Sequence, residues 1–462
     1  MERTTAKKNK YEIDMCNGTI MDKLISFSLP LMLSGILQLM FNAVDIIVVG
    51  RFSGSQALAA VGSTSALINV FTNLFIGISL GANVLTARFY AAGREKEVSE
   101  TVHTAITLAL VSGIVMALVG LVFSRGALAL MGTPDDVIGL SALYMRIYFL
   151  GMPFFMLYNY GAAILRAVGD TKRPLLFLMI AGVINACLNM VLVIVFKLGV
   201  AGVAIATVIS QMISCVLVLR CLCRSESSYR LRFSELGMKG YYLKQIFSVG
   251  VPAGIQSTVI NFSNVLLQSS VNSFGSTAMA GYTAANNLLG FLYVSVNSIT
   301  QACMSFTSQN YGVGKLKRMD RVLADCMILS VVVAVVLGCI CYGFGPEILQ
   351  IYTEDAEVIA CGMEILAYTT ITYFLCGWMD LFPGALRGMG YSAVPMVLSV
   401  IGTVGTRVVW IFGIFPYHRS LAILFISYPA SWIITIVLQV ICFYFVRRRV
   451  HRRSQALARQ EA

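Results

Sequence analysis

Residues 24–50, LISFSLPLMLSGILQLMFNAVDIIVVG, form an apolar stretch that is long enough to cross a lipid bilayer as a single helix. Two residues are unusual in such a segment. Pro30 lacks a backbone N–H group and is expected to bend the helix. Asp45 places a carboxylate in the hydrocarbon region, which costs about 2.5 to 3.5 kcal/mol on an insertion scale. The stretch therefore predicts a membrane-spanning helix with an acid that needs an explanation.

Three polar side chains of this stretch share one face of the predicted helix. Gln38, Asn42 and Asp45 lie at positions i, i+4 and i+7. Such stripes normally face the interior of a helix bundle or a water-filled cavity. The stripe indicates an ion or proton site, and the alternative is a structural hydrogen bond to a neighbouring helix.

The composition places the whole chain among the membrane proteins. The 462 residues are 58% hydrophobic and 12% charged, and a mean hydropathy of +0.79 is too high for a soluble domain. Apolar runs of this length, without alternation, form helices rather than barrel strands. The sequence therefore predicts an all-α polytopic membrane protein with about twelve transmembrane helices. The expected spans are 24–46, 57–86, 101–123, 137–160, 174–196, 200–221, 245–271, 278–307, 322–344, 358–383, 393–413 and 420–446.

The distribution of positive charge predicts the orientation of these spans. Lys and Arg concentrate in cytoplasmic loops, and most of the 34 lie on the side of the two termini. The predicted location is the inner (plasma) membrane, with many passes and both termini in the cytoplasm. The net charge of +12 is expected to meet anionic membrane lipids and needs no nucleic-acid partner. The opposite side carries only Arg51, Arg125, Lys197 and Arg419.

The second half of the chain repeats the first. Pro30 aligns with Pro252, and after a one-residue deletion Arg166 aligns with Arg387. Six spans separate the two copies, so both copies have the same topology and are related by an axis along the membrane normal. The predicted parts are a cytoplasmic N-terminal arm (1–20), an N-lobe of six helices (21–221), a cytoplasmic linker (222–244), a C-lobe of six helices (245–446) and a basic cytoplasmic tail (447–462).

The polar residues of the first lobe are not repeated in the second. Asp45 aligns with Leu267, and Asn189 aligns with Trp410. A symmetric scaffold with asymmetric charges indicates that the first lobe carries the ion chemistry. Within that lobe Gly77 and Gly81 form a GxxxG pattern, which we interpret as close helix packing inside the lobe.

Four polar side chains of the first lobe are expected at a similar depth in the membrane. Asn185 and Asn189 project from one face of the fifth span. Counted at about 1.5 Å per residue, they reach the same outer half of the bilayer as Thr207 and Asp45. One carboxylate, two amides and a hydroxyl suit a hard cation such as Na⁺. A desolvated carboxylate can exchange a proton instead, and an interhelical hydrogen-bond cluster remains the third possibility.

Five motifs together carry a family resemblance over about residues 20–446. They are VDIIVVG (44–50), LRAVGDTKRP (165–174), NACLN (185–189), GVAGVAIAT (199–207) and LRGMG (386–390). With these motifs the chain resembles the multidrug and toxic compound extrusion (MATE) transporters. The resemblance implies two six-helix lobes in a V and export of organic cations in exchange for Na⁺ or H⁺. It also implies that Asp45, Asn185 and Asn189 bind the coupling cation, with Thr207 as a further ligand.

The second lobe departs from one pattern of that family. Some members have an acid in the seventh span, where this chain reads AGIQSTVINFSN after Pro252. Glu364 and Asp380 are the acids of the tenth span, and we interpret both as residues at its ends. A second ion site is therefore not expected, although a role of these two acids in ion coupling stays open.

Other polar residues within the spans are candidates for contact with a substrate. The methionines and phenylalanines, 22 and 26 in number, suit a broad and adaptable cavity. The same residue types are ordinary packing residues of membrane helices. The candidates are Gln38, Phe41, Asn42, Asn69, Asn73, Asn159, Gln256, Asn261 and Asn264.

Other classes of function fit the sequence less well. The chain has three histidines and no phosphate-binding or paired-carboxylate motif, so neither an enzyme nor an ATP-driven pump is expected. The alternative is a flippase for lipid-linked saccharides, which shares the broader fold. Only Arg146 and Arg407 lie within spans, which is few for binding a pyrophosphate. We expect a monomer without a cofactor other than the coupling ion.

Overall fold

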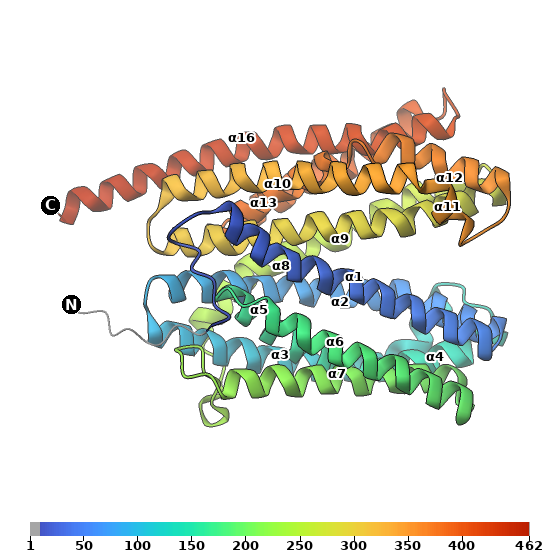
Figure 1. The fold of residues 1–462 in the computed structure, drawn as a ribbon, viewed down its shortest axis with the longest axis horizontal. Coiled ribbons are helices and arrows are strands. Elements are labelled where there is room, and N and C mark those ends of the chain that lie inside the picture. Colours follow the sequence, from blue (N-terminus) through green and yellow to red (C-terminus); the bar gives the residue numbers. More distant parts are fainter. Residues whose placement is uncertain (1–9, 462) are drawn as a thin grey trace. The chain divides into compact units, whose positions relative to one another are not determined.

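A computed structural model describes residues 10–461, so that residues 1–9 of the predicted N-terminal arm and residue 462 lie outside the described part. The described residues form helices joined by short connections, and no strand occurs among them (Figure 1). The helices of the first half are α1 (Met21–Phe52), α2 (Ser55–Ala91), α3 (Glu95–Leu130), α4 (Asp135–Leu150), α5 (Met152–Ala167), α6 (Lys172–Asn189), the π-helix η1 (Met190–Val195) and α7 (Gly199–Cys223).

The second half repeats this order of helices. A short 3₁₀ turn, η2 (Phe233–Glu235), precedes it in the connection from α7. The helices are α8 (Gly240–Asn272), α9 (Ser276–Gly312), α10 (Leu316–Gly343), α11 (Gly345–Gln350), α12 (Ala356–Thr369), α13 (Tyr373–Gly388), α14 (Ala393–Ser399), the π-helix η3 (Val400–Gly405), α15 (Thr406–Val409), the π-helix η4 (Trp410–Ile414) and α16 (Leu421–Glu461).

The predicted internal repeat is visible in where helices begin. The pairs α2 and α9, α3 and α10, α4 and α12, α5 and α13, and α6 and α14 all begin with the same separation along the chain as Arg166 and Arg387. Each copy also bends at the same place, by 47° between α4 and α5 and by 51° between α12 and α13. The two halves therefore share one helical scaffold.

The expected membrane spans correspond to helices of the structure. Eight described helices are long and apolar enough to cross a membrane, and each of the two bent pairs makes one further span. The two remaining expected spans are α8 and α9, which have 33 and 37 residues and a more polar sequence. The prediction of an all-α polytopic membrane protein with two related six-helix halves is confirmed.

The chain forms two compact units whose boundaries differ from those of the predicted lobes. Among the described residues, unit 1 comprises 10–14 and 33–254, and unit 2 comprises 15–32 and 255–461. The chain thus changes unit inside α1 and inside α8, at equivalent positions shortly after Pro30 and Pro252. Helix α1 is continuous through Pro30. The start of α1 packs within unit 2, where Phe27 meets Phe306 edge-to-face with ring centroids 5.6 Å apart.

The GxxxG pattern of α2 allows a close backbone approach within unit 1. A Cβ atom on Gly77 would overlap the backbone of Gly254, and one on Gly81 would overlap the carbonyl of Ile246. Both contacts are with the first part of α8, which the sequence assigned to the other lobe. The pattern therefore serves close helix packing, as predicted, but the partner α8 lies outside the predicted N-lobe (21–221).

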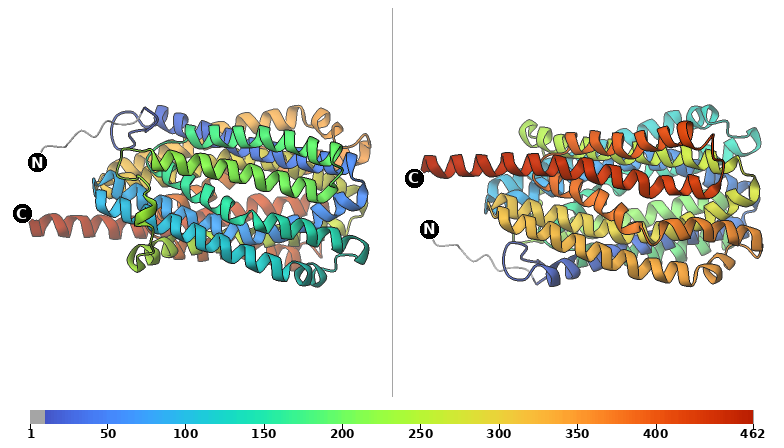
Figure 2. Two further views of the ribbon diagram at one scale, coloured as in Figure 1. Left: turned by 90° about the horizontal axis from the view of Figure 1, so that it is seen from below. Right: turned by 90° about the horizontal axis from the view of Figure 1, so that it is seen from above.

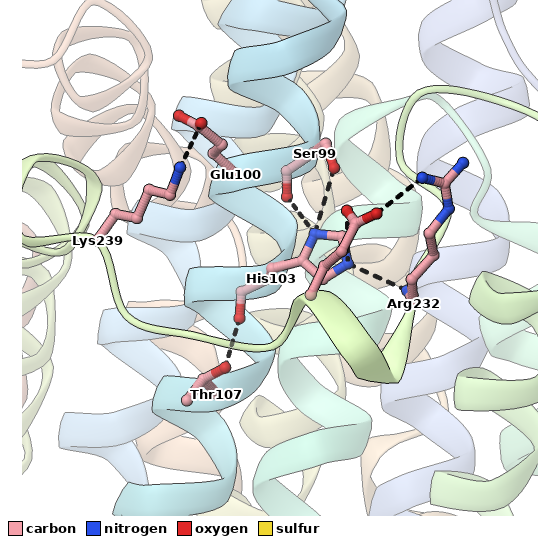
Figure 3. Close-up of polar contacts among 7 residues, drawn as sticks. Ser99, Glu100, His103, Thr107, Arg232 and Lys239 are labelled. Carbon is pink, nitrogen blue, oxygen red and sulfur yellow. Dashed lines mark hydrogen bonds and ion pairs between the residues drawn. The ribbon is translucent and has the colours of Figure 1, made fainter.

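The connection from α7 to α8 docks on the end of α3 (Figure 3). The imidazole Nε2 of His103 accepts a hydrogen bond from the backbone N–H of Arg232 at 3.1 Å. Its Nδ1 therefore carries the proton of the neutral ring and donates to the carbonyl of Ser99 at 2.6 Å. Lys239 forms an ion pair with Glu100, with Nζ 2.5 Å from Oε1. These contacts fix the course of residues 224–239 within unit 1.

The C-terminal helix does not stop where the predicted tail begins. Helix α16 runs to Glu461, and its last turns extend beyond the neighbouring helices of unit 2 (Figure 2). Arg447 holds Asp320 in a two-point contact, with both N–O distances 2.6 Å. The start of the basic segment is therefore part of the α16 helix and packs on α10.

The loop between α5 and α6 provides a test of the packing of the N-terminal segment. Gly169 has φ +95°, and a Cβ atom there would lie 2.6 Å from the backbone nitrogen of Ile13. Gly169→Ala is expected to lower the free energy of unfolding by about 1–3 kcal/mol, because it adds backbone strain and a clash. Thermal unfolding of the purified protein measures the effect.

Gly93→Ala is the matched control for this substitution. Gly93 has φ +70° but no atom within 4 Å of the Cβ position, so it isolates the strain from the clash. The larger loss is expected at Gly169. Equal losses at both positions would contradict tight packing of Ile13 on the loop.

Candidate functional site

Asp45 lies in the second part of α1 and is buried within unit 1, with 9% of its surface exposed. The carboxylate accepts a hydrogen bond at Oδ1 from Nδ2 of Asn189. At Oδ2 it accepts from the hydroxyl of Thr207 at 3.4 Å, and that hydroxyl also donates to the carbonyl of Val203 at 3.0 Å. Helices α1, α6 and α7 thus converge on one carboxylate.

The two asparagines of α6 are held together by the helix that carries them. Positions i and i+4 place Asn185 and Asn189 on one face, and Asn189 Nδ2 donates to Asn185 Oδ1 at 3.2 Å. Both are buried, with 5% and 0% of their surfaces exposed. The α-helical spacing ends at Asn189, and the chain continues in the wider turns of η1. Such π-helical segments are frequent at functional sites because they reorient the residues beside them.

One atom of this cluster has no hydrogen-bond partner. Asn189 Oδ1 is buried and receives no hydrogen bond from the described residues. An unsatisfied buried carbonyl is unfavourable by about 1–3 kcal/mol unless another group or ion approaches it. The atom lies on the residue that already donates to Asp45, so a buried acceptor without a hydrogen bond belongs to the same cluster as the carboxylate.

The surroundings of the cluster are aromatic and contain no second acid among its described partners. Tyr144 and Tyr148 of α4 lie within electrostatic range of Asp45, and their rings stack with centroids 6.1 Å apart. A single carboxylate balances one positive charge, which suits a monovalent cation or a proton. Among residues 10–461, no group of three His, Cys, Asp or Glu side chains converges as a metal site. Sequence analysis missed the two tyrosines, because aromatic residues in a span resemble packing residues.

The structure brings the four predicted ligands together, which is the geometry that the depth argument expected. Asp45, Asn189 and Thr207 are joined directly, and Asn185 is joined through Asn189. The binding of a cation by these side chains stays a prediction.

Unit 2 carries a buried positive charge between the helices that correspond to α1 and α6. Arg407 of α15 has 3% of its surface exposed. Its Nη1 donates to Ser263 Oγ at 3.1 Å and to Asn264 Oδ1 at 2.7 Å. The guanidinium also lies over the ring of Tyr428, 4.7 Å from the centroid. The sequence showed Arg407 as a charged residue within a span, but it could not show which residues form hydrogen bonds with it.

The predicted substrate residues lie in different environments. Gln38, Asn42, Asn69 and Asn261 are exposed, whereas Phe41, Asn73, Asn159 and Asn264 are half-buried and Gln256 is buried.

Several of these candidates are engaged within their own unit. The ring of Phe41 packs on Gly182 of α6, and Asn159 donates to the carbonyl of Phe155 at 2.8 Å. Gln256 accepts from Arg387 at 2.6 Å. These contacts give the side chains structural roles, and their contact with a substrate stays a prediction.

The two acids of the tenth span are separated by the bend between α12 and α13. Glu364 is half-buried on α12 and Asp380 is half-buried on α13. Asp380 has Arg387 as its charged neighbour, about two turns later on the same helix. A positive neighbour already balances this acid within unit 2.

The chain is similar to proteins of one transporter family. The MatE family model matches it twice, over residues 30–191 and 252–412. The probable multidrug resistance protein YoeA of Bacillus subtilis (strain 168) is 32% identical over 434 residues, which cover 92% of this chain and 93% of that protein. The multidrug export protein MepA of Staphylococcus aureus (strain NCTC 8325 / PS 47) is 22% identical over 382 residues, or 82% of this chain and 84% of that protein.

Solved structures show the same fold. The outward-facing conformation of a multidrug resistance MATE family transporter of the MOP superfamily matches with a TM-score of 0.87 at 19% identity, over 97% of this chain and 100% of that chain. A crystal structure of MATE in the bent conformation matches with a TM-score of 0.85 at 19% identity, over 96% and 98%. At 19% sequence identity, the likeness to these structures shows that the fold is shared and nothing more.

The two family matches begin at Pro30 and Pro252, which align with each other in the internal repeat. They cover most of both halves, and the match to YoeA extends over nearly the whole chain. The proteins of this family are membrane transporters rather than enzymes. The chain belongs to the multidrug and toxic compound extrusion (MATE) family.

Proposed function

We propose that the protein is a secondary active multidrug exporter that moves organic, often cationic, compounds in antiport with Na⁺ or H⁺ by alternating access. The names of the relatives as multidrug resistance and export proteins support the class of substrate. The single observation that carries the antiport is the buried Asp45 carboxylate, which is paired with neutral donors instead of a basic side chain.

The unfilled carbonyl of Asn189 supports a coupling ion at this site. In the present arrangement Nδ2 of Asn189 faces Asp45, while Oδ1 has no partner. A half-turn of the amide about its terminal side-chain bond would exchange the two atoms. Two oxygens would then face each other, which is favourable only with a cation between them or a proton on Asp45. In this proposal the orientation of the Asn189 amide depends on whether Asp45 is charged and empty or has taken up a cation or a proton.

Coupling in this proposal follows from different affinities in two states. Asp45 takes up the cation from the outside, and the changed hydrogen bonding of Asn189 favours release of the exported compound. Loading of a new compound from the cytoplasm then favours release of the cation on that side. Each ligand shifts the equilibrium only by its difference in affinity between the two states. With both termini in the cytoplasm, as the charge distribution predicts, the site lies in the outer half of the membrane.

Transport by the purified protein in vesicles tests the proposal. Ethidium efflux is followed while a Na⁺ gradient or a pH gradient is imposed separately. Efflux that one of the two gradients drives would support the antiport and identify the ion. Intact protein that responds to neither gradient would overturn it, and transfer of a lipid-linked saccharide would then be the next activity to measure.

Asn189→Ala is expected to reduce gradient-driven efflux by about 5- to 150-fold, the range of a typical coupling free energy. The substitution removes both the donor to Asp45 and the unfilled carbonyl. Initial rates in the same vesicles measure the effect. Asn272→Ala, at an exposed position near the end of α8, is the matched control and is expected to leave the rate unchanged. Wild-type efflux by Asn189→Ala would show that the amide has only a structural role.

A further inference from the structure

Unit 1 contains a basic cavity where α6 begins and α7 ends. This cavity is separate from the Asp45 site. The cavity has a volume of about 710 Å³. Its walls carry four basic side chains, Lys10, Arg173, Arg220 and Arg224, and one carboxylate, Glu226. We propose that this cavity binds the phosphate group of an anionic phospholipid from the cytoplasmic leaflet.

The basic side chains come from three separate parts of the chain. Arg220 and Arg224 lie one turn apart at the end of α7, Arg173 is in the first turn of α6, and Lys10 precedes α1. Basic residues at a helix C-terminus are common because they interact well with the helix dipole. The helix dipole explains the two arginines at the end of α7. It does not explain why Lys10 and Arg173 line the same cavity.

Arg173 is held in place by neighbouring side chains, but one nitrogen of its guanidinium has no hydrogen-bond partner within the described part of the chain. Its Nε pairs with the fully buried carboxylate of Asp170, which also accepts the backbone N–H of Arg173 at 3.1 Å. The guanidinium lies over the ring of Tyr11, 5.4 Å from the centroid. Its Nη2 is buried and has no hydrogen-bond partner among the described residues. A held guanidinium with a free donor is prepared for an oxygen anion.

The other three basic side chains of the cavity form no ion pair among the described residues, although Glu226 lines the same cavity. Within residues 10–461, no carboxylate lies within ion-pair distance of Lys10, Arg220 or Arg224. The nearby hydroxyl of Ser225 adds a polar group to the same wall. Several basic donors around one space suit a phosphate better than a carboxylate, because a phosphate accepts more hydrogen bonds.

The other wall of the cavity selects a lipid over a soluble phosphate compound. Phe177 and Leu217 line the same cavity, so that it offers an apolar surface together with the basic side chains. The charge distribution predicts that this end of the bundle meets the cytoplasmic leaflet, which carries the anionic lipids. A headgroup phosphate can occupy the basic part while the attached glycerol and chains follow the apolar wall. The inference does not depend on the transport activity proposed above.

Lipid binding by the full-length purified protein tests this inference without measuring transport. Native mass spectrometry would follow titrations with phosphatidylglycerol, phosphatidylcholine and inorganic phosphate. The test variant is Arg220→Gln/Arg224→Gln, at two exposed positions where folding is expected to be preserved. The matched control is Arg230→Gln/Lys244→Gln, which removes the same charge from exposed positions of unit 1 outside the cavity.

Wild-type protein is expected to bind phosphatidylglycerol more tightly than phosphatidylcholine. The test variant should lose about 10- to 30-fold in affinity for phosphatidylglycerol, from the contribution of two basic groups near an anionic surface. The control should keep the wild-type affinity, and Arg220→Lys/Arg224→Lys should retain most of it.

Three results would overturn the inference. Equal losses in the test and control variants would mean that only diffuse charge attracts the lipid. Unchanged affinity in the test variant would mean that the lipid binds elsewhere. Binding of inorganic phosphate that depends on Arg220 and Arg224, without such dependence for phosphatidylglycerol, would assign the cavity to a soluble phosphate compound.

Discussion

Asp45→Asn is expected to reduce the concentrative export of ethidium from cells strongly, with steady-state accumulation rising toward the level of cells that lack the protein. Asparagine preserves the size of the side chain but carries no charge and takes up neither a proton nor a cation at ordinary pH. The contacts with Asn189 and Thr207 can largely re-form, so that folding should be preserved. Loss of a coupling free energy of typical size reduces transport by about 5- to 150-fold.

The measurement compares ethidium accumulation at equal amounts of protein in the membrane. Asp136→Asn is the control, because Asp136 is an exposed carboxylate of the same unit at the start of α4. It should accumulate no more ethidium than wild type. Export by Asp45→Asn at the wild-type rate against a gradient would contradict a coupling role for this carboxylate.

Gly77→Leu in α2 is expected to produce a large loss of stability. A Cβ atom at Gly77 would overlap the Cα and nitrogen of Gly254, and backbone atoms of two packed helices cannot move apart locally. Overpacking a well-packed interface typically costs about 1–3 kcal/mol and sometimes more. A backbone clash belongs at the upper end of that range. Thermal unfolding in detergent should therefore begin at a clearly lower temperature.

Gly62→Leu is the control for this substitution on the same helix. No atom lies within 4 Å of its Cβ position, so the same side chain meets open space there. It should change the unfolding temperature little. Similar losses at Gly62 and Gly77 would show that leucine is disfavoured in α2 for a reason other than its contact with α8.

The repeat made much of the fold predictable from one sequence. Apolar runs fix where membrane helices form, because a backbone in lipid must satisfy its own hydrogen bonds. Pro30 and Pro252 marked equivalent helices, and the paired helix starts of the two halves agree with that alignment. The sequence could not show that the chain changes compact unit within α1 and α8. That change depends on packing between distant segments, and a hydropathy pattern carries no information on it.

The sequence predicted which residues form the site, but it could not predict which of their atoms form the hydrogen bonds. Spacing placed Asn185 and Asn189 on one face, and counting residues from the helix ends matched their depth to Asp45. Which amide atom faces the carboxylate depends on side-chain rotation, which spacing cannot reveal. The contact of His103 with the backbone N–H of Arg232 could likewise not be predicted, because the two residues lie far apart in the sequence.

The difference between the two halves has a physical counterpart in the structure. The first half pairs α1 with α6 through the Asp45 carboxylate, whereas the second pairs the equivalent helices through the Arg407 guanidinium. A fixed internal cation disfavours the binding of another cation beside it. This arrangement agrees with an ion site in the first half alone.

Simultaneous recording of ethidium release and ion movement in one vesicle preparation tests the central claim most directly. Wild type, Asp45→Asn and Asp380→Asn would be compared under the gradient that drives efflux. The account predicts a constant ratio of ions to ethidium in wild type and Asp380→Asn, and loss of both movements in Asp45→Asn. Ion-coupled release by Asp45→Asn, or loss of coupling in Asp380→Asn alone, would contradict a coupling site in the first unit.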